Sequence, residues 1–286
     1  MFDATELSII RRAYARQVMF LGRADNPALE DAYASVPREA YLGPGPWPIL
    51  RWPGGYLTTP DSDPAWLYSD VLVGIVTERR LNNGQPSAHA AWIDAAAPAP
   101  GEHVVHVGAG VGYYSAIMEH MAGPSGALTA IEFDADLAAR AAANLAHLPG
   151  AKVLHGDGSV ARFESADVIY VNAGASRPAE AWLDGLKEGG RLILPLTTNA
   201  NFTLEPGRPT GAVFRITRRG DTFGADVVGP IWVFPCEGAR DEVSERALAA
   251  AFEKGGFERV KQLRRTDDVS DDDCWVRAPG WALTYH

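Results

Sequence analysis

Cysteine is scarce, an excess of basic charge is missing, and no long apolar run occurs in this chain of 286 residues. The two cysteines, Cys236 and Cys274, have neither zinc-site nor redox-motif spacing, so we expect no disulfide framework and no metal. Acidic residues number 36 and basic residues 26, a balance that disfavours capture of nucleic-acid phosphates.

A membrane location is also not expected. No run approaches the roughly 18 apolar residues that span a bilayer. The first twelve residues carry acidic side chains where a signal peptide has basic ones. We therefore expect a cytoplasmic protein with neither a membrane nor a nucleic-acid partner.

The first hundred residues differ from the rest in the spacing of apolar residues and in proline and glycine content. Residues 4–35 carry apolar side chains at helical spacing, with a break at Asn26-Pro27. The segment 43–64 is dense in proline, glycine and tryptophan, which disfavours regular strand pairing. We expect residues 1–100 to form an N-terminal helical region with an irregular segment that is either a lid on the acceptor side or a plug at the core edge.

Short apolar runs alternate with helix-length segments from His103 onward. This alternation is typical of a doubly wound α/β fold, and runs that are almost entirely hydrophobic indicate parallel strands covered on both faces. We expect residues 101–240 to form this core. Residues 241–286 are expected to add a helix and a strand that complete an antiparallel edge.

A glycine-rich turn, Gly108-Ala109-Gly110-Val111-Gly112, follows the first apolar run and leads into a predicted helix at Tyr113. Glycines at the carboxyl end of such a strand let a ligand approach the backbone, and the free N–H groups of the helix face it. Glu132 ends the next run, 20 positions after Gly112, where a carboxylate can accept both ribose hydroxyls of a nucleoside cofactor.

A second carboxylate extends this predicted pocket. Asp157 follows the third run in the sequence His155-Gly156-Asp157-Gly158, and it is placed to accept a hydrogen bond from an adenine amino group. The third glycine of the turn comes one residue earlier than in a dinucleotide fingerprint, so NAD is the weaker candidate. The G-x-G-x-G form resembles motif one of class I S-adenosylmethionine-dependent methyltransferases. In that comparison Asn172, after the fourth run, faces the methyl group and the acceptor.

The order of motifs further resembles protein-L-isoaspartate O-methyltransferases. The resemblance runs from about Val36 to Pro235 and includes Val36-Pro37-Arg38-Glu39, Tyr68-Ser69-Asp70, Gly84-Gln85-Pro86-Ser87 and Gly190-Arg191-Leu192-Ile193-Leu194-Pro195. It implies methyl transfer from S-adenosylmethionine to the carboxylate of an isoaspartyl peptide or a related acceptor, with S-adenosylhomocysteine as the product. The cofactor-binding residues it implies are Gly108, Ala109, Gly110, Gly112, Tyr113, Glu132, Phe133, Asp157, Gly158 and Asn172. The catalytic candidates are Ser87, Tyr68 and His89.

Two positions depart from the family pattern. Gly84 stands where relatives carry a serine that helps to hold the isoaspartyl group, so Gly84→Ser is expected to raise isoaspartyl methylation if only that hydroxyl is missing. Ser87 either places a hydroxyl nearby or caps its helix. His106 stands where relatives carry an acid close to the cofactor. Either cofactor binding is weaker for this reason, or His106 is a histidine of the core.

The chemistry required depends on the acceptor. A carboxylate is already ionised near neutrality and needs no general base. A hydroxyl acceptor would need one, for which His89 is the candidate. The alternatives therefore left open are a small-molecule O- or N-methyltransferase, a cofactor-binding homologue without activity, and an NAD-dependent enzyme.

Overall fold

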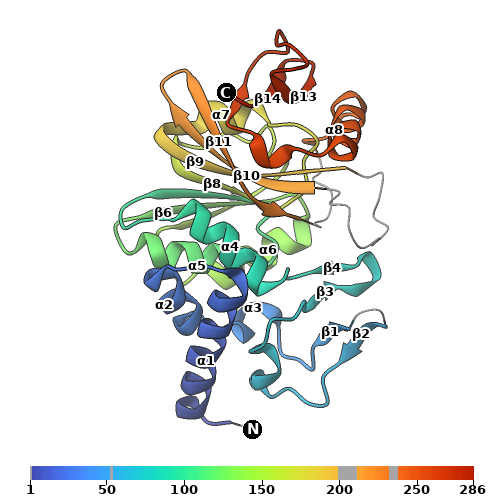
Figure 1. Cartoon of the computed structure of the whole chain (residues 1–286). Helices are drawn as coiled ribbons and strands as arrows, with labels where there is room; N and C mark the ends of the chain where they lie inside the picture. The colour runs from blue at the N-terminus through green and yellow to red at the C-terminus, as the bar shows by residue number, and fades with distance from the viewer. Residues whose placement is uncertain (1, 52–53, 199–210, 232–237) are drawn as a thin grey trace.

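A ten-stranded sheet forms the centre of the molecule (Figure 1). The computed structural model describes residues 2–51, 54–198, 211–231 and 238–286. The strand order is β13-β14-β12-β11-β10-β9-β8-β5-β6-β7. Neighbouring strands are parallel from β7 to β9 and antiparallel from β9 to β13, which confirms the predicted α/β class with its antiparallel C-terminal edge.

The strands of this sheet have the following bounds: β5 His103–Val107, β6 Ala127–Glu132, β7 Ala151–His155, β8 Ala166–Val171, β9 Leu186–Thr197, β10 Gly211–Arg219, β11 Thr222–Pro230, β12 Gln262–Arg264, β13 Cys274–Ala278 and β14 Trp281–Thr284. The helices are α1 Ala4–Gly22, α2 Pro27–Ser35, α3 Glu39–Leu42, α4 Pro86–Ala96, α5 Tyr113–Ala122, α6 Ala135–Leu145, α7 Glu180–Gly185 and α8 Glu242–Lys254. Three 3-10 turns cover Pro64–Leu67, Thr77–Arg79 and Phe257–Arg259.

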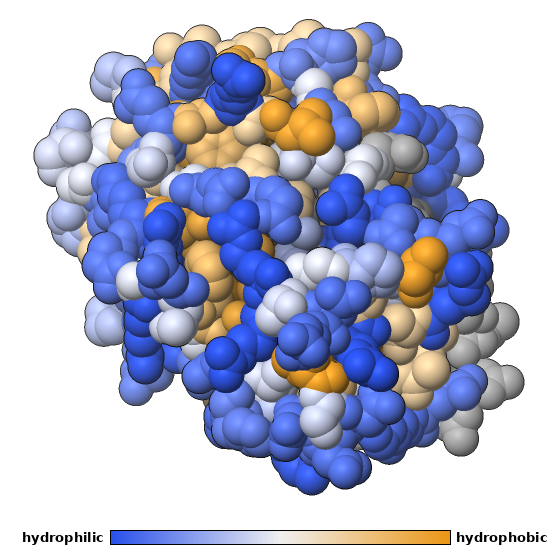
Figure 2. All heavy atoms as spheres, turned by 90° about the horizontal axis from the view of Figure 1, so that it is seen from above, coloured by the Kyte–Doolittle hydropathy of each residue, from blue (hydrophilic) through white to orange (hydrophobic). Residues whose placement is uncertain are grey.

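Each face of the sheet has its own hydrophobic core, because successive strand residues point to opposite sides. Val104 of β5 packs in the core that includes α1, α2, α4 and α5, whereas Val105 and Val107 pack in the core that includes α7, α8 and the C-terminal strands. Figure 1 shows the N-terminal helices on one side of the sheet and the C-terminal elements on the other. Figure 2 views the molecule from the side of the C-terminal elements and shows mainly hydrophilic residues there, with smaller hydrophobic areas among them. This double cover explains why the parallel strands are apolar at almost every position.

The segment 43–64 contradicts the expectation of an irregular loop. It contains strand β1, Pro48–Arg51, paired antiparallel with β2, Gly55–Thr58. A second small hairpin joins β3, Gly74–Val76, to β4, Leu81–Asn82. Pairing survives in the first hairpin because its proline begins a strand, where the missing N–H removes no essential hydrogen bond.

Two short strands of the C-terminal edge, β12 and β13, were not predicted either, since each lies in a polar context that hides its pattern. Cys274 is a free, buried thiol in β13, and Cys236 lies outside the described residues. Within the described ranges, no helix is both long and apolar enough to cross a bilayer.

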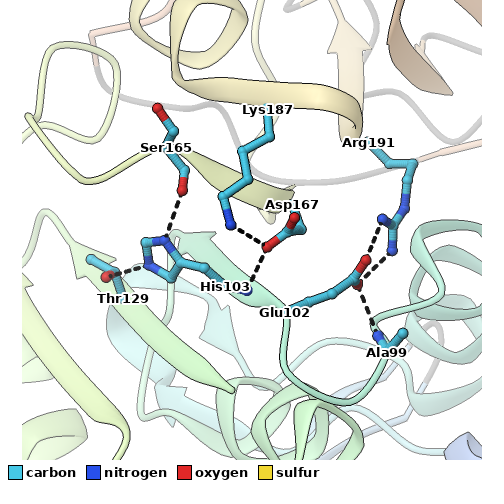
Figure 3. A network of polar contacts seen from close by, with 8 residues as sticks. All are labelled: Ala99, Glu102, His103, Thr129, Ser165, Asp167, Lys187 and Arg191. Atoms are coloured by element: carbon cyan, nitrogen blue, oxygen red, sulfur yellow. Dashed lines mark hydrogen bonds and ion pairs between the residues drawn. The ribbon is translucent and has the colours of Figure 1, made fainter. Parts of the chain in front are cut away.

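A polar network ties together the amino ends of three parallel strands (Figure 3). The carboxylate of Asp167 in β8 accepts bonds from Lys187 Nζ at 2.7 Å and from the backbone N–H of His103 at 2.8 Å. Arg191 of β9 makes a bidentate ion pair with Glu102, with both N–O distances at 2.8 Å. The network lies at the opposite end of these strands from the glycine turn, so it stabilises the sheet at the end away from the predicted site.

Candidate active site

The glycine turn is joined to the end of the neighbouring strand through Glu132. Its Oε2 accepts the N–H of Gly110 at 2.7 Å, and its Oε1 accepts the N–H of Asp134 at 3.0 Å. Burial raises the pKa of Glu132, and the hydrogen bonds from these N–H groups oppose that rise. A carboxylate has about four acceptor positions, so both oxygens can still accept ribose hydroxyls.

The shape of the turn suits a nucleoside. Gly110 has a φ of +57°, and a Cβ added there would meet nothing within 4 Å, so the backbone faces open space. Asn172, at the end of β8, donates from Nδ2 to the carbonyl of Gly108 at 3.3 Å and so holds the start of the turn. These residues fit a bound nucleoside with its ribose at Glu132.

The two residues predicted for the adenine end lie on neighbouring loops. Phe133 follows Glu132 directly and is 54% exposed, which leaves an aromatic face free to cover a base. Asp157 accepts the N–H of Ser159 through Oδ1 at 2.8 Å. Its other oxygen lies against Gly238, where an added Cβ would be 2.2 Å from Oδ2. Gly158 packs against Val107, and its carbonyl accepts the indole N–H of Trp182 at 2.8 Å.

Two residues near the turn have side chains in the core. Tyr113 is fully buried with its ring edge-on to Tyr41 and Tyr114, so only its backbone faces the predicted pocket. His106 is also buried and shares a 2.7 Å hydrogen bond between Nδ1 and Ser115 Oγ. Burial lowers the pKa of His106 to about 3, so it is neutral, as a core histidine is.

By the family resemblance, the segments 68–70 and 84–87 border the acceptor, and we call them the acceptor side. Asp70 connects the two segments. Its carboxylate accepts the backbone N–H of Ser87 at 2.8 Å, the hydroxyl of Ser87 at 2.7 Å and Gln85 Nε2 at 2.8 Å. Asp70 therefore caps the N-terminus of α4 from a distant part of the chain. The Ser87 hydroxyl is engaged in this cap.

Tyr68 lies in a separate cluster. Its hydroxyl contacts Glu39 and accepts a bond from Arg11 Nε at 2.7 Å. Burial and the neighbouring Glu39 raise the pKa of Tyr68, while Arg11 opposes the shift. Arg38, which is wholly buried, donates to the carbonyls of Leu67 and Val71 at 2.7 and 2.8 Å and so fixes the backbone on both sides of Asp70.

His89 of α4 lies between the acceptor side and the glycine turn. Its ring stacks on Tyr114, with centroids 3.5 Å apart and planes 9° apart, and its Nδ1 is 2.8 Å from the hydroxyl of Tyr170 in β8. Gly84 has a φ of +71°, and a Cβ there would lie 2.3 Å from His89 Nε2. The gain expected for Gly84→Ser required that only a hydroxyl be missing, and this condition is not met, because a side chain at 84 would also have to displace this ring.

Arg240 is a supporting residue that the sequence did not reveal. It donates to the carbonyl of Gly174 at 2.7 Å and to Oγ1 of Thr197 at 3.0 Å, and it pairs with Glu245 at 2.9 Å. The loop after Asn172 is thereby attached to α8. An isolated arginine between two elements carries no local motif, so only its spatial neighbours identify it.

Comparison with known proteins agrees with this architecture. Residues 61–211, just over half of the chain, match the family model described as Protein-L-isoaspartate(D-aspartate) O-methyltransferase (PCMT). A protein-L-isoaspartate O-methyltransferase of Methylorubrum populi is 35% identical over 213 residues, which cover 73% of this chain and 85% of that protein. A relative of the same name from Thermotoga maritima is 29% identical over 171 residues, and these cover 58% of this chain but only 49% of the relative.

The fold has solved counterparts. One is a protein described as a putative protein-L-isoaspartate O-methyltransferase from Plasmodium falciparum in complex with S-adenosyl-L-homocysteine. It aligns with a TM-score of 0.60 and 18% identity, over 79% of this chain and 98% of that one. The glycine turn, the carboxylate that ends the next strand and these matches together show that the chain belongs to the protein-L-isoaspartate(D-aspartate) O-methyltransferase family of S-adenosylmethionine-dependent methyltransferases.

Proposed function

We propose that this enzyme methylates the carboxylate of an isoaspartyl residue in a peptide or protein. The observation that carries the proposal is the family match over residues 61–211, which includes both the acceptor-side segment around Asp70 and the glycine turn. The structure supports it by packing His89 of the acceptor side on Tyr114, two residues after Gly112 of the turn. We also propose that the protein is located in the cytoplasm.

In the proposed site, Glu132 holds the ribose of S-adenosylmethionine and Phe133 covers its adenine. Asp157 accepts the adenine amino group, and the Gly108–Gly112 turn lies along the amino-acid part together with Asn172. The bound cofactor supplies a methyl group on an electron-poor sulfonium. The protein aligns the acceptor with that methyl group and shields both from water.

A carboxylate acceptor suits the residues present. Near neutral pH it is ionised and needs no proton removed, since model carboxyl pKa values are about 3.9–4.3. Burial holds the pKa of His89 well below its usual value, with smaller contributions from His106 and Arg38, so His89 is neutral. We propose that Ser87 and Tyr68 act by shaping the acceptor side, because both hydroxyls are engaged with carboxylates.

The test is methyl transfer from labelled S-adenosylmethionine to a synthetic isoaspartyl peptide. The matched control is the same peptide with a normal aspartyl residue, which has the same composition and charge. We expect base-labile methyl ester on the first peptide and little on the second. Equal labelling of both peptides, or of neither while the cofactor binds, would contradict the proposed acceptor.

A further inference from the structure

Most polar side chains of the acceptor side are already engaged. The Ser87 hydroxyl and Gln85 Nε2 donate to Asp70, and the Tyr68 hydroxyl contacts Glu39. Two nitrogens in the segments around Gly84 have no hydrogen-bond partner among the described residues, Nδ2 of Asn83 and Nε2 of His89. The Asn83 nitrogen is enclosed, so His89 Nε2 is the stronger candidate for a contact with substrate.

The surroundings of His89 fix the orientation of its ring. The side chain is 2% exposed, held between the stacked ring of Tyr114 and the hydroxyl of Tyr170. Nε2 is the nitrogen that faces Gly84, where an added Cβ would lie 2.3 Å from it. Because Gly84 has no side chain, a ligand can approach this edge of the ring over the backbone of residue 84.

The hydrogen bond at the other nitrogen sets the chemistry of Nε2. A phenol hydroxyl donates more strongly than it accepts, so we assign the proton of Tyr170 to the bond with Nδ1, and the ring proton is then on Nε2. A neutral N–H donor orients a carboxylate without a full positive charge beside it. An ammonium or guanidinium at this place would withdraw more electron density from the attacking oxygen.

We propose that His89 binds the acceptor carboxylate through Nε2–H, next to Gly84, and thereby selects a carboxylate as the methyl acceptor. This inference rests on the proposed isoaspartyl function. His89 also lies close to the proposed cofactor site. Its neighbour Tyr170 is on β8 two residues before Asn172, and its neighbour Tyr114 is the second residue of the helix after the glycine turn. The acceptor would thus be held at the junction of the turn, β8 and the Gly84 loop.

Two substitutions distinguish the contributions of the two ring nitrogens of His89. An asparagine amide reaches the place of Nδ1, and a glutamine amide reaches the place of Nε2. His89→Asn therefore keeps a partner for Tyr170 and removes the donor beside Gly84, whereas His89→Gln keeps that donor. We expect His89→Asn to raise KM for the isoaspartyl peptide about tenfold to hundredfold, the usual effect of losing a hydrogen bond to a charged group. His89→Gln should stay within several-fold of the wild type.

The dissociation constant of S-adenosylmethionine and the thermal midpoint are measured on the same full-length proteins. The dissociation constant should stay close to wild type in both His89 variants. Both variants lose the buried ring and its stack on Tyr114, so the thermal midpoint should fall in both, and the difference in KM between them reports the donor at Nε2. Should His89→Asn not fold, Tyr170→Phe supplies the second test. It removes the hydroxyl that holds the ring proton on Nε2 while the ring of His89 stays in place, and KM is again expected to rise.

The outcomes are distinguishable. An unchanged KM in His89→Asn, or an equal rise of KM in both His89 variants, overturns the role of Nε2 while the wild type still methylates the isoaspartyl peptide. A wild type that binds the cofactor yet fails to methylate that peptide overturns the proposed function and, with it, this inference.

Discussion

At the scale of single residues, Glu132 offers the sharpest test of the cofactor pocket. Glu132→Ala removes the acceptor for Gly110 N–H and both proposed ribose contacts, and each charge-assisted bond contributes about 1.5–3 kcal/mol. We expect the affinity for S-adenosylmethionine, measured by calorimetry, to fall at least tenfold. Glu132→Gln, which keeps one acceptor oxygen, should lie between this variant and the wild type. Unchanged affinity in Glu132→Ala would remove Glu132 from the pocket.

The same scale shows where sequence reasoning ends. The relation between Glu132 and the glycine turn was predictable, because the carboxyl ends of adjacent parallel strands meet at one edge of the sheet. The contact between Gly84 and His89 was not, because it depends on a positive φ and on the path of a loop. The sequence therefore suggests that serine at position 84 is favourable, whereas the structure shows that it would meet the ring of His89.

At the scale of elements, Arg240 connects the loop after β8 to α8. In Arg240→Ala the Gly174 carbonyl and the Thr197 hydroxyl lose their donor inside a mostly buried site. We expect a loss of about 2–3 kcal/mol in the free energy of unfolding. Hydrogen exchange at residues 173–176 should become faster.

Arg246→Ala is the matched control for that variant. Arg246 also pairs with an acid of α8, Glu242, but both side chains are largely exposed. Such a pair contributes about 0.3–0.5 kcal/mol, so its thermal midpoint should barely change. Equal effects of the two substitutions would contradict a bridging role for Arg240.

Strands that are buried on both faces could be predicted from the sequence. The parallel strands have apolar side chains on both faces, so β5 and β6 were recognised at their observed bounds. The β1–β2 hairpin was missed because its proline and glycine content indicates a loop, although the proline falls at a strand start. β12 and β13 were missed because their apolar pattern is weak: β12 has a single apolar residue, Leu263, between two polar ones, and β13 is interrupted by Arg277.

At the scale of the whole molecule, Asp167 in the network at the amino ends of the strands is expected to contribute to stability against acid. Burial alone would raise the pKa of Asp167, but the bonds from Lys187 and His103 N–H hold that pKa below its ordinary value. A carboxyl with a lowered folded pKa stabilises the native state above its unfolded pKa of about 3.9. This stabilisation disappears as pH falls through that value and the lower folded one.

Asp167→Asn should therefore be less stable than the wild type at pH 7, by about 1 kcal/mol, and should lose less stability between pH 5 and pH 3. Denaturant titrations at several pH values measure both effects. Asp226→Asn serves as the control, since Asp226 pairs with Arg215 at an exposed site and its removal should alter the profile little. Parallel profiles for wild type and Asp167→Asn would refute the account.

The way the C-terminal strands join the main sheet also bears on solubility. β12 covers β11 at Phe223 and Gly224, and Phe223 is buried beneath this cover. A chain cut after α8 would leave this stretch of β11 as a bare, partly apolar edge, a template for pairing with other molecules. We therefore expect residues 255–286 to protect this part of β11 from pairing with other molecules, whatever they contribute to methyl transfer.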